Sequence, residues 1–388
     1  MYNFDQKLDQ RGFDVKWDFP RYPVAGDKPL IPMWVADMDF AVPDCVIHAI
    51  QNRLKHPTFG YCDDPDPNFA QSILHWVRGR RGVTDLRPEL IRYQNSALGG
   101  VVAAIKTLTQ PGDPVLVHLP NYNGFTHAIA DAERRLVGSP LVRDGEGLFR
   151  IDLEDMEQRI LAENVKCLLF CAPHNPTGRV WSREETEKVC ALCEKHGVSI
   201  ISDEVWADFV YAPARHVPVT QVSKYAHEHT ITICGASKTF NLAGLHTSYS
   251  VVYNPELRKR FHERSGESNC NEPNTLSVAA LIGAYTGGEH YVDELVDYIR
   301  KNMELAHAFI SREIPSVKSA LPEGTYTMWL DFTGAGRSQE ENIRRLGEQG
   351  LVLSPGGDYH GEGWFRMNVA CPRAQVEQAL QALKAAME

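Results

Sequence analysis

The sequence has no long apolar run and no excess of positive charge. No stretch approaches the ~18 consecutive apolar residues that a membrane-spanning helix requires, and the opening residues MYNFDQKLDQRGFD contain no apolar segment typical of a signal peptide. The formal net charge of −10 gives no overall field that would attract nucleic acid or an anionic membrane. We therefore expect a cytoplasmic protein with neither nucleic acid nor a membrane as partner.

The sequence also lacks the cysteine spacing of a disulfide framework. Its nine cysteines are scattered and odd in number, which is typical of reduced thiols in a reducing compartment. Cys190, Cys193 and His196 lie three residues apart and could share a helix face as metal ligands. The same run begins with Ser182 and Glu185 spaced as a capping box, which predicts an amphipathic helix. Because no fourth ligand is near, we predict that both cysteines pack as small apolar groups and that there is no metal site.

What the chain does have is a regular alternation of apolar runs and helical patterns. Between about residues 90 and 255, short apolar segments alternate with amphipathic stretches, which predicts a mostly parallel sheet covered by helices on both faces. The expected strands are Pro114–His118, Lys166–Cys171, Val198–Ser202, Thr230–Cys234 and Thr247–Tyr253. In such sheets ligands bind beyond the carboxyl ends of the strands.

The C-terminal quarter has a different pattern. A long helix over Glu289–Ile314 is followed by a strand over Tyr326–Phe332, a helix over Ser338–Gln349 and a strand around Trp364–Ala370. We therefore predict an α/β protein with a large domain over residues 46–285, a smaller α+β domain over 286–388, and an N-terminal segment, 1–45, that packs with the small domain.

Three successive strands of the predicted sheet end in an amide, a carboxylate and an amine. The first precedes the run APHNPTG with Asn175, the second precedes Asp203, and the third precedes GASKTFN with Lys238. A lysine among small residues and apolar segments is partly desolvated, which lowers its pKa and favours Schiff-base chemistry. An amine, a carboxylate for a ring nitrogen and an amide for a phenolic oxygen form the set that a pyridinium aldehyde needs. Taken singly, the NPTG turn and the Asp could equally be structural.

In this order, the NPTG, DEVW and SKTFN runs resemble those of the class I/II aminotransferases and their relatives. Within that group the chain is similar to C–S β-lyases of the MalY/PatB type. The runs that carry this closer likeness are VADMDF (35–40), FGY (59–61), PNYNGF (120–125), GTY (324–326) and RMNVACPR (366–373). The resemblance covers the chain from about residue 10 onward. It implies the aspartate-aminotransferase fold and pyridoxal 5′-phosphate (PLP) as cofactor.

The resemblance implies that four residues hold the ring and the aldehyde carbon of the cofactor. Lys238 would carry PLP covalently and shuttle protons. Asp203 would pair with the ring nitrogen and Asn175 with the phenolic oxygen, while Tyr122 matches the aromatic residue that stacks on the ring.

The resemblance also implies a phosphate site and a homodimer. The backbone amides of Gly100, Val101 and Val102, at the start of a predicted helix, would hold the phosphate, together with the Ser237 hydroxyl. Tyr61 matches a tyrosine that reaches the phosphate from the neighbouring subunit, so the active sites would be shared.

Substrate binding would rest mainly on an arginine. Arg366 matches the residue that clamps the α-carboxylate of an amino acid, a task suited to a planar guanidinium. Asp37, in the loop before the first large helix, and Tyr122 are also expected to bind the substrate.

Two cofactor positions depart from the family pattern. Trp206 stands where a tyrosine or histidine commonly bonds the phenolic oxygen, and an indole can only donate. His246 stands where aminotransferases carry a phosphate-binding arginine, which counts against an ordinary aminotransferase.

We therefore expect a PLP-dependent β-lyase acting on cystathionine, cysteine or a cysteine S-conjugate. An L-amino-acid aminotransferase would use the same residues and remains the alternative. A regulatory protein that keeps the PLP site only for stability is disfavoured by the complete set of Lys238, Asp203, Asn175 and Arg366.

Overall fold

The computed structural model describes residues 1–388 except 1, 19, 25–27, 63–66 and 146. Its largest sheet is parallel through the centre and antiparallel toward both edges. In spatial order its strands are β2 (Ile91–Gln94), β9 (Ser248–Val251), β8 (Thr230–Gly235), β7 (Ser199–Asp203), β6 (Cys167–Cys171), β3 (Pro114–Leu119), β4 (Arg135–Arg143) and β5 (Phe149–Ile151). Because β6, β7 and β8 are neighbouring parallel strands, the residues that follow them meet at one edge of the sheet.

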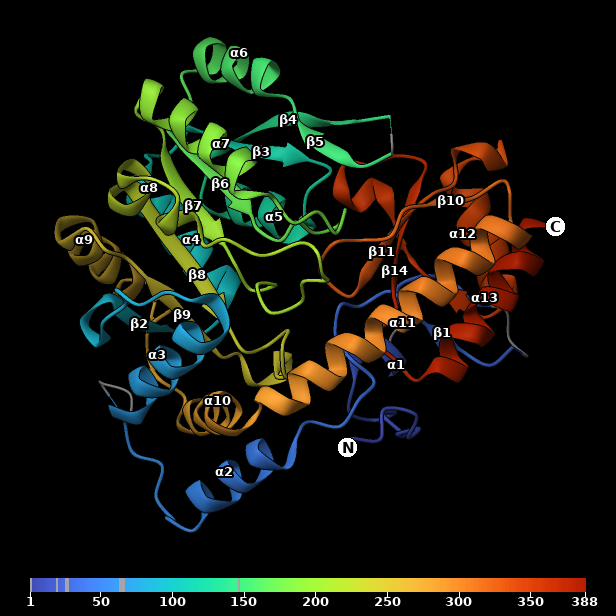
Figure 1. Ribbon diagram of the computed structural model, residues 1–388, viewed down its shortest axis with the longest axis horizontal. Coiled ribbons are helices and arrows are strands. Elements are labelled where there is room, and N and C mark those ends of the chain that lie inside the picture. Colours follow the sequence, from blue (N-terminus) through green and yellow to red (C-terminus); the bar gives the residue numbers. More distant parts are fainter. Residues whose placement is uncertain (1, 19, 25–27, 63–66, 146) are drawn as a thin grey trace.

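Helices cover both faces of this sheet (Figure 1). Alternate residues of the apolar strands point to opposite sides, so Leu169 and Ile201 belong to one buried cluster while Phe170 and Ile200 belong to another. The first cluster lies under α4 (Ala97–Leu108), α5 (Asn123–Asp131) and α9 (Pro255–Gly266). The second lies under α6 (Leu153–Glu163), α7 (Arg183–His196) and α8 (Lys224–His229).

A second, antiparallel sheet is formed by the C-terminal part of the chain. Its order is β10 (Lys318–Ser319), β11 (Thr327–Asp331), β14 (Trp364–Asn368) and β13 (Ser354–Pro355). The helices of this region are α11 (Glu289–Glu313), α12 (Gln339–Glu348) and α13 (Arg373–Met387). Figure 1 shows this region beside the large sheet.

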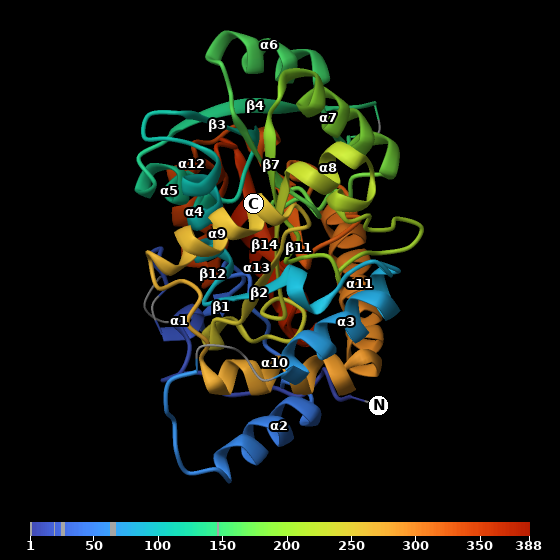
Figure 2. The same cartoon turned by 90° about the vertical axis from the view of Figure 1, so that its left-hand side faces the viewer.

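The N-terminal residues lie against this C-terminal region. Strand β1 (Ile31–Pro32) pairs in parallel with β12 (Leu351–Val352), and the short helix α1 (Val15–Asp18) precedes it. Helices α2 (Asp44–Leu54), α3 (Pro67–Arg81) and α10 (Thr275–Gly287) pack together below the large sheet (Figure 2).

The predicted fold class is confirmed. The strands expected in the large sheet all form, with ends shifted by up to two residues. The long helix α11 and the strands β11 and β14 lie where the C-terminal pattern indicates. The boundaries proposed for the domains stay a prediction.

The run with two cysteines forms α7, and Ser182 caps it through the Glu185 backbone with the capping box complete. Cys190 and Cys193 are buried in the core, while His196 Nε2 lies 2.7 Å from Glu157 Oε1. Among the described residues, no cluster of three or more His, Cys, Asp or Glu side chains could hold a metal ion. Within the same residues, no helix combines the length and apolar character needed to span a membrane.

Candidate active site

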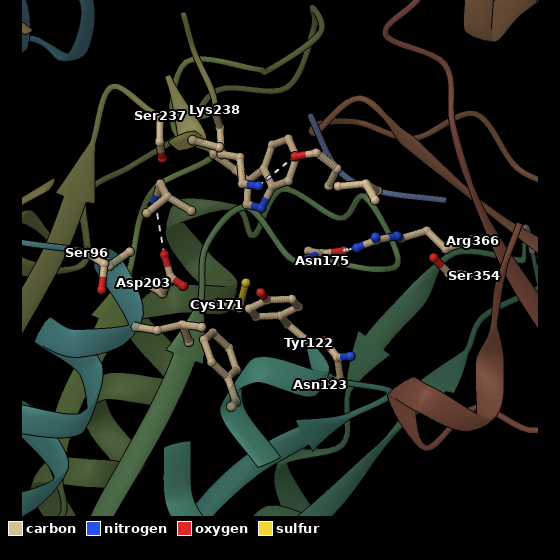
Figure 3. Close-up of a pocket in the computed structure, with 18 of the residues that line it drawn as sticks. Ser96, Tyr122, Asn123, Cys171, Asn175, Asp203, Ser237, Lys238, Ser354 and Arg366 are labelled. Atoms are coloured by element: carbon tan, nitrogen blue, oxygen red, sulfur yellow. Dashed lines mark hydrogen bonds between the residues drawn. The ribbon is translucent and has the colours of Figure 1, made fainter. Parts of the chain in front are cut away.

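A cavity of about 430 Å³ lies at the carboxyl ends of β6, β7 and β8 and is also lined by Ser354 and Arg366 of the second sheet. Residues from the large sheet, the N-terminal segment and the C-terminal region line it together. Figure 3 shows several of these side chains directed into the same space. Lining residues with polar or aromatic side chains include Trp34, Ser96, Tyr122, Asn175, Asp203, Trp206, Ser237, Lys238, His246, Asp358, Tyr359 and Arg366.

Lys238 follows β8, and its amine is aimed at the opposite wall of the cavity. Its Nζ donates a 2.6 Å hydrogen bond to the carbonyl oxygen of Ala36 and lies 5.5 Å from the centre of the Trp206 ring. Burial, aided by the nearby Arg366 guanidinium, lowers the pKa of Lys238 to about 8. A free amine is therefore accessible near neutral pH, as nucleophilic and proton-transfer chemistry requires.

Asp203 is the last residue of β7 and is almost completely buried. Its Oδ1 accepts a 3.1 Å hydrogen bond from the backbone N–H of Val205. Burial raises the pKa of Asp203 to about 6, against the opposing effects of that hydrogen bond and of Lys238. A buried carboxylate with so few partners favours a cationic group placed beside it.

Asn175 and Arg366 contact each other across the cavity (Figure 3). Arg366 lies on β14, and its Nη1 donates to Asn175 Oδ1 at 3.1 Å, while its Nη2 donates to the carbonyl oxygen of Trp34 at 3.0 Å. The guanidinium carbon lies 4.9 Å from the centre of the Tyr359 ring. Arg366 Nε is buried without a hydrogen-bond partner. The Arg366 guanidinium is therefore oriented and retains donor capacity for an anion.

The beginning of α4 reaches the cavity, but not through the residues expected from the sequence. Ser96, Ala97 and Leu98 line the cavity, whereas Gly100, Val101 and Val102 do not. The Gly100 N–H donates to the Ser96 carbonyl inside the helix. Since α4 starts at Ala97, the amides of its first turn have no helical acceptor. The predicted phosphate-facing positions lie too far into the helix to present unused amides.

Ser96 caps this helix, because its side-chain oxygen accepts a 3.0 Å hydrogen bond from the Gly99 amide. Gly100 packs tightly under the sheet, where an added Cβ would lie 3.0 Å from Ile233 Cδ1. Close packing is thus the role that the structure gives Gly100.

Four further residues named from the sequence line the cavity: Tyr122, Trp206, Ser237 and His246. The Tyr122 ring packs edge-on against Phe125 at 5.5 Å. Trp206 is buried against Tyr326, with ring centres 4.5 Å apart. The Trp206 ring therefore lines the cavity next to Lys238. The sequence alone does not indicate this position.

Two named residues do not reach the cavity within this chain. The Asp37 carboxylate forms an ion pair with Lys16, Oδ1 to Nζ 2.6 Å, and is not part of the cavity lining. Tyr61 is fully exposed and borders a separate open hollow beside α10. Its contribution to a neighbouring subunit stays a prediction.

Several residues that shape the site were missed. Asn368 donates from Nδ2 to the carbonyls of Val35 and Asp37, at 2.7 and 2.6 Å. Ser96 caps α4. A signal existed for Asn368, which lies two residues after Arg366 and so faces the same side of β14. The position of Ser96 is set by helix-start geometry, for which the sequence has no comparable pattern.

Comparisons with known proteins agree with this geometry. The family model "aminotransferase class I and II" matches residues 28–383. The chain is 36% identical over 389 residues to cystathionine β-lyase PatB of Bacillus subtilis, covering 99% of this chain and all of that protein. It is 30% identical over 390 residues to protein MalY of Escherichia coli, covering 99% and 98%.

Solved structures give the same result. The PLP-containing cystalysin of Treponema denticola superposes with a TM-score of 0.92 at 28% identity, covering all of this chain and 98% of that one. The PLP-bound C–S lyase of Staphylococcus hominis gives a TM-score of 0.89 at 29% identity, covering 100% and 99%. The resemblance inferred from the motifs is confirmed, and the chain belongs to the aminotransferase class I and II family.

Proposed function

We propose that this protein is a PLP-dependent β-lyase that cleaves the Cβ–S bond of cystathionine, cysteine or a cysteine S-conjugate. The products would be a thiol, pyruvate and ammonia. One observation carries the proposal: a lysine amine of lowered pKa shares one cavity with Asp203, Asn175 and the oriented guanidinium of Arg366. C–S lyase activity in general is also what the names of its relatives describe.

The donor set of the cavity fits PLP. Lys238 supplies the amine, and the buried Asp203 carboxylate suits a protonated ring nitrogen. Asn175 has its Oδ1 occupied by Arg366, so its Nδ2 remains available to donate to a phenolic oxygen. The first-turn amides of Ala97 and Leu98, with the hydroxyls of Ser96 and Ser237, suit the phosphate.

When bound, PLP supplies an aldehyde that condenses with amines and a ring that accepts the electron pair released at Cα. Arg366 binds the α-carboxylate of the substrate and thereby fixes which face of Cα meets Lys238. With the cofactor bound, the Lys238 amine would remove the Cα proton of the substrate as a general base. Trp206 and Tyr122 line this space with aromatic rings.

The relatives favour β-lyase activity over transamination. The proteins matched at 36% and 30% identity include a cystathionine β-lyase, whereas the aspartate aminotransferase of Bacillus sp. YM-2 is 23% identical. His246 in place of an arginine supports the same choice. Equal release of a thiol, pyruvate and ammonia from L-cystathionine, L-cysteine or a cysteine S-conjugate tests the proposal, and absence of these products with every one of the three substrates would refute it.

We further propose a cytoplasmic homodimer with shared sites. Buried thiols such as Cys167 and Cys193 suit a reducing compartment. Tyr61 and Phe59 are large exposed side chains on one loop, as expected for a surface that a second subunit covers.

A further inference from the structure

One buried lysine of the N-terminal segment has no role in the proposed reaction. Lys16, on α1, is completely buried, and its Nζ lies 2.6 Å from Asp37 Oδ1 and 2.6 Å from Asp39 Oδ1. Within the described part of the chain, the ion-pair partners of this ammonium are the Asp37 and Asp39 carboxylates. Their charges more than offset the cost of burial and raise the pKa of Lys16. The group therefore stays charged throughout the working range of an enzyme.

The two carboxylates belong to a short segment, residues 34–39, hereafter the 34–39 loop. Its backbone carbonyls hold two residues assigned to the chemistry. The Ala36 carbonyl accepts from Lys238 Nζ at 2.6 Å, and the Trp34 carbonyl accepts from Arg366 Nη2 at 3.0 Å. Both contacts depend on where the backbone of the 34–39 loop lies.

Other hydrogen bonds also hold the backbone of this loop, whereas its Asp37 carboxylate is paired with Lys16. Tyr326 Oη donates to the Ala36 carbonyl at 2.9 Å, and Asn368 donates to the carbonyl of Asp37. The Asp37 carboxylate has Lys16 as its ion-pair partner, whereas Asp39 also accepts from Gln375 at 2.9 Å. Without Lys16, the buried carboxylate of Asp39 and the partly buried carboxylate of Asp37 would face each other with no cation between them, an unfavourable arrangement.

The link to α1 runs in both directions. The Trp34 indole N–H donates to the Lys16 carbonyl at 3.2 Å, and the Trp17 indole N–H donates to Asp39 Oδ1 at 3.2 Å. The N-terminal segment thus contacts the 34–39 loop through the backbone carbonyl of Lys16 and through the side chain of Trp17.

We propose that Lys16 is a positioning residue for substrate binding: through Asp37 and Asp39 it fixes the 34–39 loop, and so sets the direction of the Arg366 clamp and of the Lys238 amine. Asp37, expected to meet the substrate directly, acts in this account through Lys16. The inference rests on the proposed roles of Arg366 and Lys238.

If Lys16 has this role, its replacement should raise KM for the substrate and leave the dissociation constant for PLP nearly unchanged. A displacement of the loop by ~1 Å can cost ~100-fold in turnover, and the Trp34 contact should express it mainly in KM. The groups that suit the ring nitrogen and the phosphate of PLP belong to the large sheet and its helix rather than to the 34–39 loop: Asp203 ends β7, Ser237 follows β8 and Ser96 precedes α4. The affinity for PLP should therefore be little affected. A purely stabilising residue would lower the melting temperature and leave KM unchanged in the surviving folded protein.

The test compares three variants of the PLP-loaded full-length protein with L-cystathionine. Lys16→Met should raise KM by about tenfold or more while the dissociation constant for PLP stays within about threefold. Asp39→Asn, which leaves Lys16 paired with Asp37, should raise KM by about threefold. Lys7→Met, an exposed lysine of the same segment, should match wild type.

Wild-type turnover is measured first, because its absence would reject the proposed function rather than the role of Lys16. The positioning role is overturned if Lys16→Met keeps KM within about twofold of wild type. If Lys16→Met does not fold, an unchanged KM in folded Asp39→Asn overturns the role, and a raised KM supports it.

Discussion

Arg366 Nη1 donates a 3.1 Å hydrogen bond to Asn175 Oδ1, which joins two residues 191 positions apart in the sequence. The bond links the loop after β6 to the strand β14 of the second sheet. It orients the guanidinium on one side and leaves the amide nitrogen of Asn175 free to donate on the other. A single contact thus couples the groups proposed for the substrate carboxylate and for the ring of the cofactor.

Removing the guanidinium should impair substrate binding most. Arg366→Ala is expected to raise KM by about 100-fold for any amino-acid substrate, since a charge-assisted bidentate contact is lost. The PLP absorbance should survive. Steady-state kinetics with L-cystathionine measure the effect, and Arg373→Ala, outside the cavity lining, is the control. If KM moved in Arg373→Ala instead, the clamp would be Arg373.

Lys238 should be the residue that carries the cofactor. Borohydride reduction of the yellow protein should fix PLP to the peptide that contains Lys238. Lys238→Ala should bind PLP non-covalently while turnover falls by about 10³-fold or more, because the proton-transferring amine is gone. Mass spectrometry of the reduced peptide checks the assignment, and label on another lysine would refute it.

The lowered pKa of Lys238 predicts its pH-dependent reactivity. As pH rises the ammonium loses its proton, so labelling of Lys238 in apoenzyme by an amine-reactive reagent should reach half its maximal rate near pH 8. Arg366→Met removes a neighbouring positive charge that lowers this pKa, so the midpoint should move to higher pH. Peptide-resolved labelling rates measure both midpoints. A midpoint near that of an exposed lysine, ~10.4, would contradict the burial of this amine.

Most of the cavity could be predicted from the sequence because its residues follow strands. Asn175, Asp203 and Lys238 each come after an apolar run, and neighbouring parallel strands must end at one edge. Helix α4 starts about three residues before the predicted position, because a glycine-rich run does not say which amides the first helical turn leaves unused. The Lys16–Asp37 pair could not be predicted, since nothing local in the sequence matches a buried ammonium to its carboxylates.

Subunit mixing tests whether the sites are shared. Tyr61→Phe and Lys238→Ala subunits should each be impaired alone, but a mixed dimer places both changes in one site and leaves the other intact. Activity should recover to about a quarter of wild type on random exchange of equal amounts. With exchange confirmed by native mass spectrometry, no recovery would mean that Tyr61 does not serve the neighbouring site.

The central claim is that the protein eliminates a thiol and does not transaminate. The most direct measurement is pyruvate formation from L-cystathionine by the PLP-loaded protein with no added 2-oxo acid. We predict continuous release of pyruvate and homocysteine over many turnovers, because elimination returns Lys238 and the cofactor to their starting state. A reaction that stops after about one turnover per subunit, and resumes only when 2-oxoglutarate or pyruvate is supplied, would contradict it.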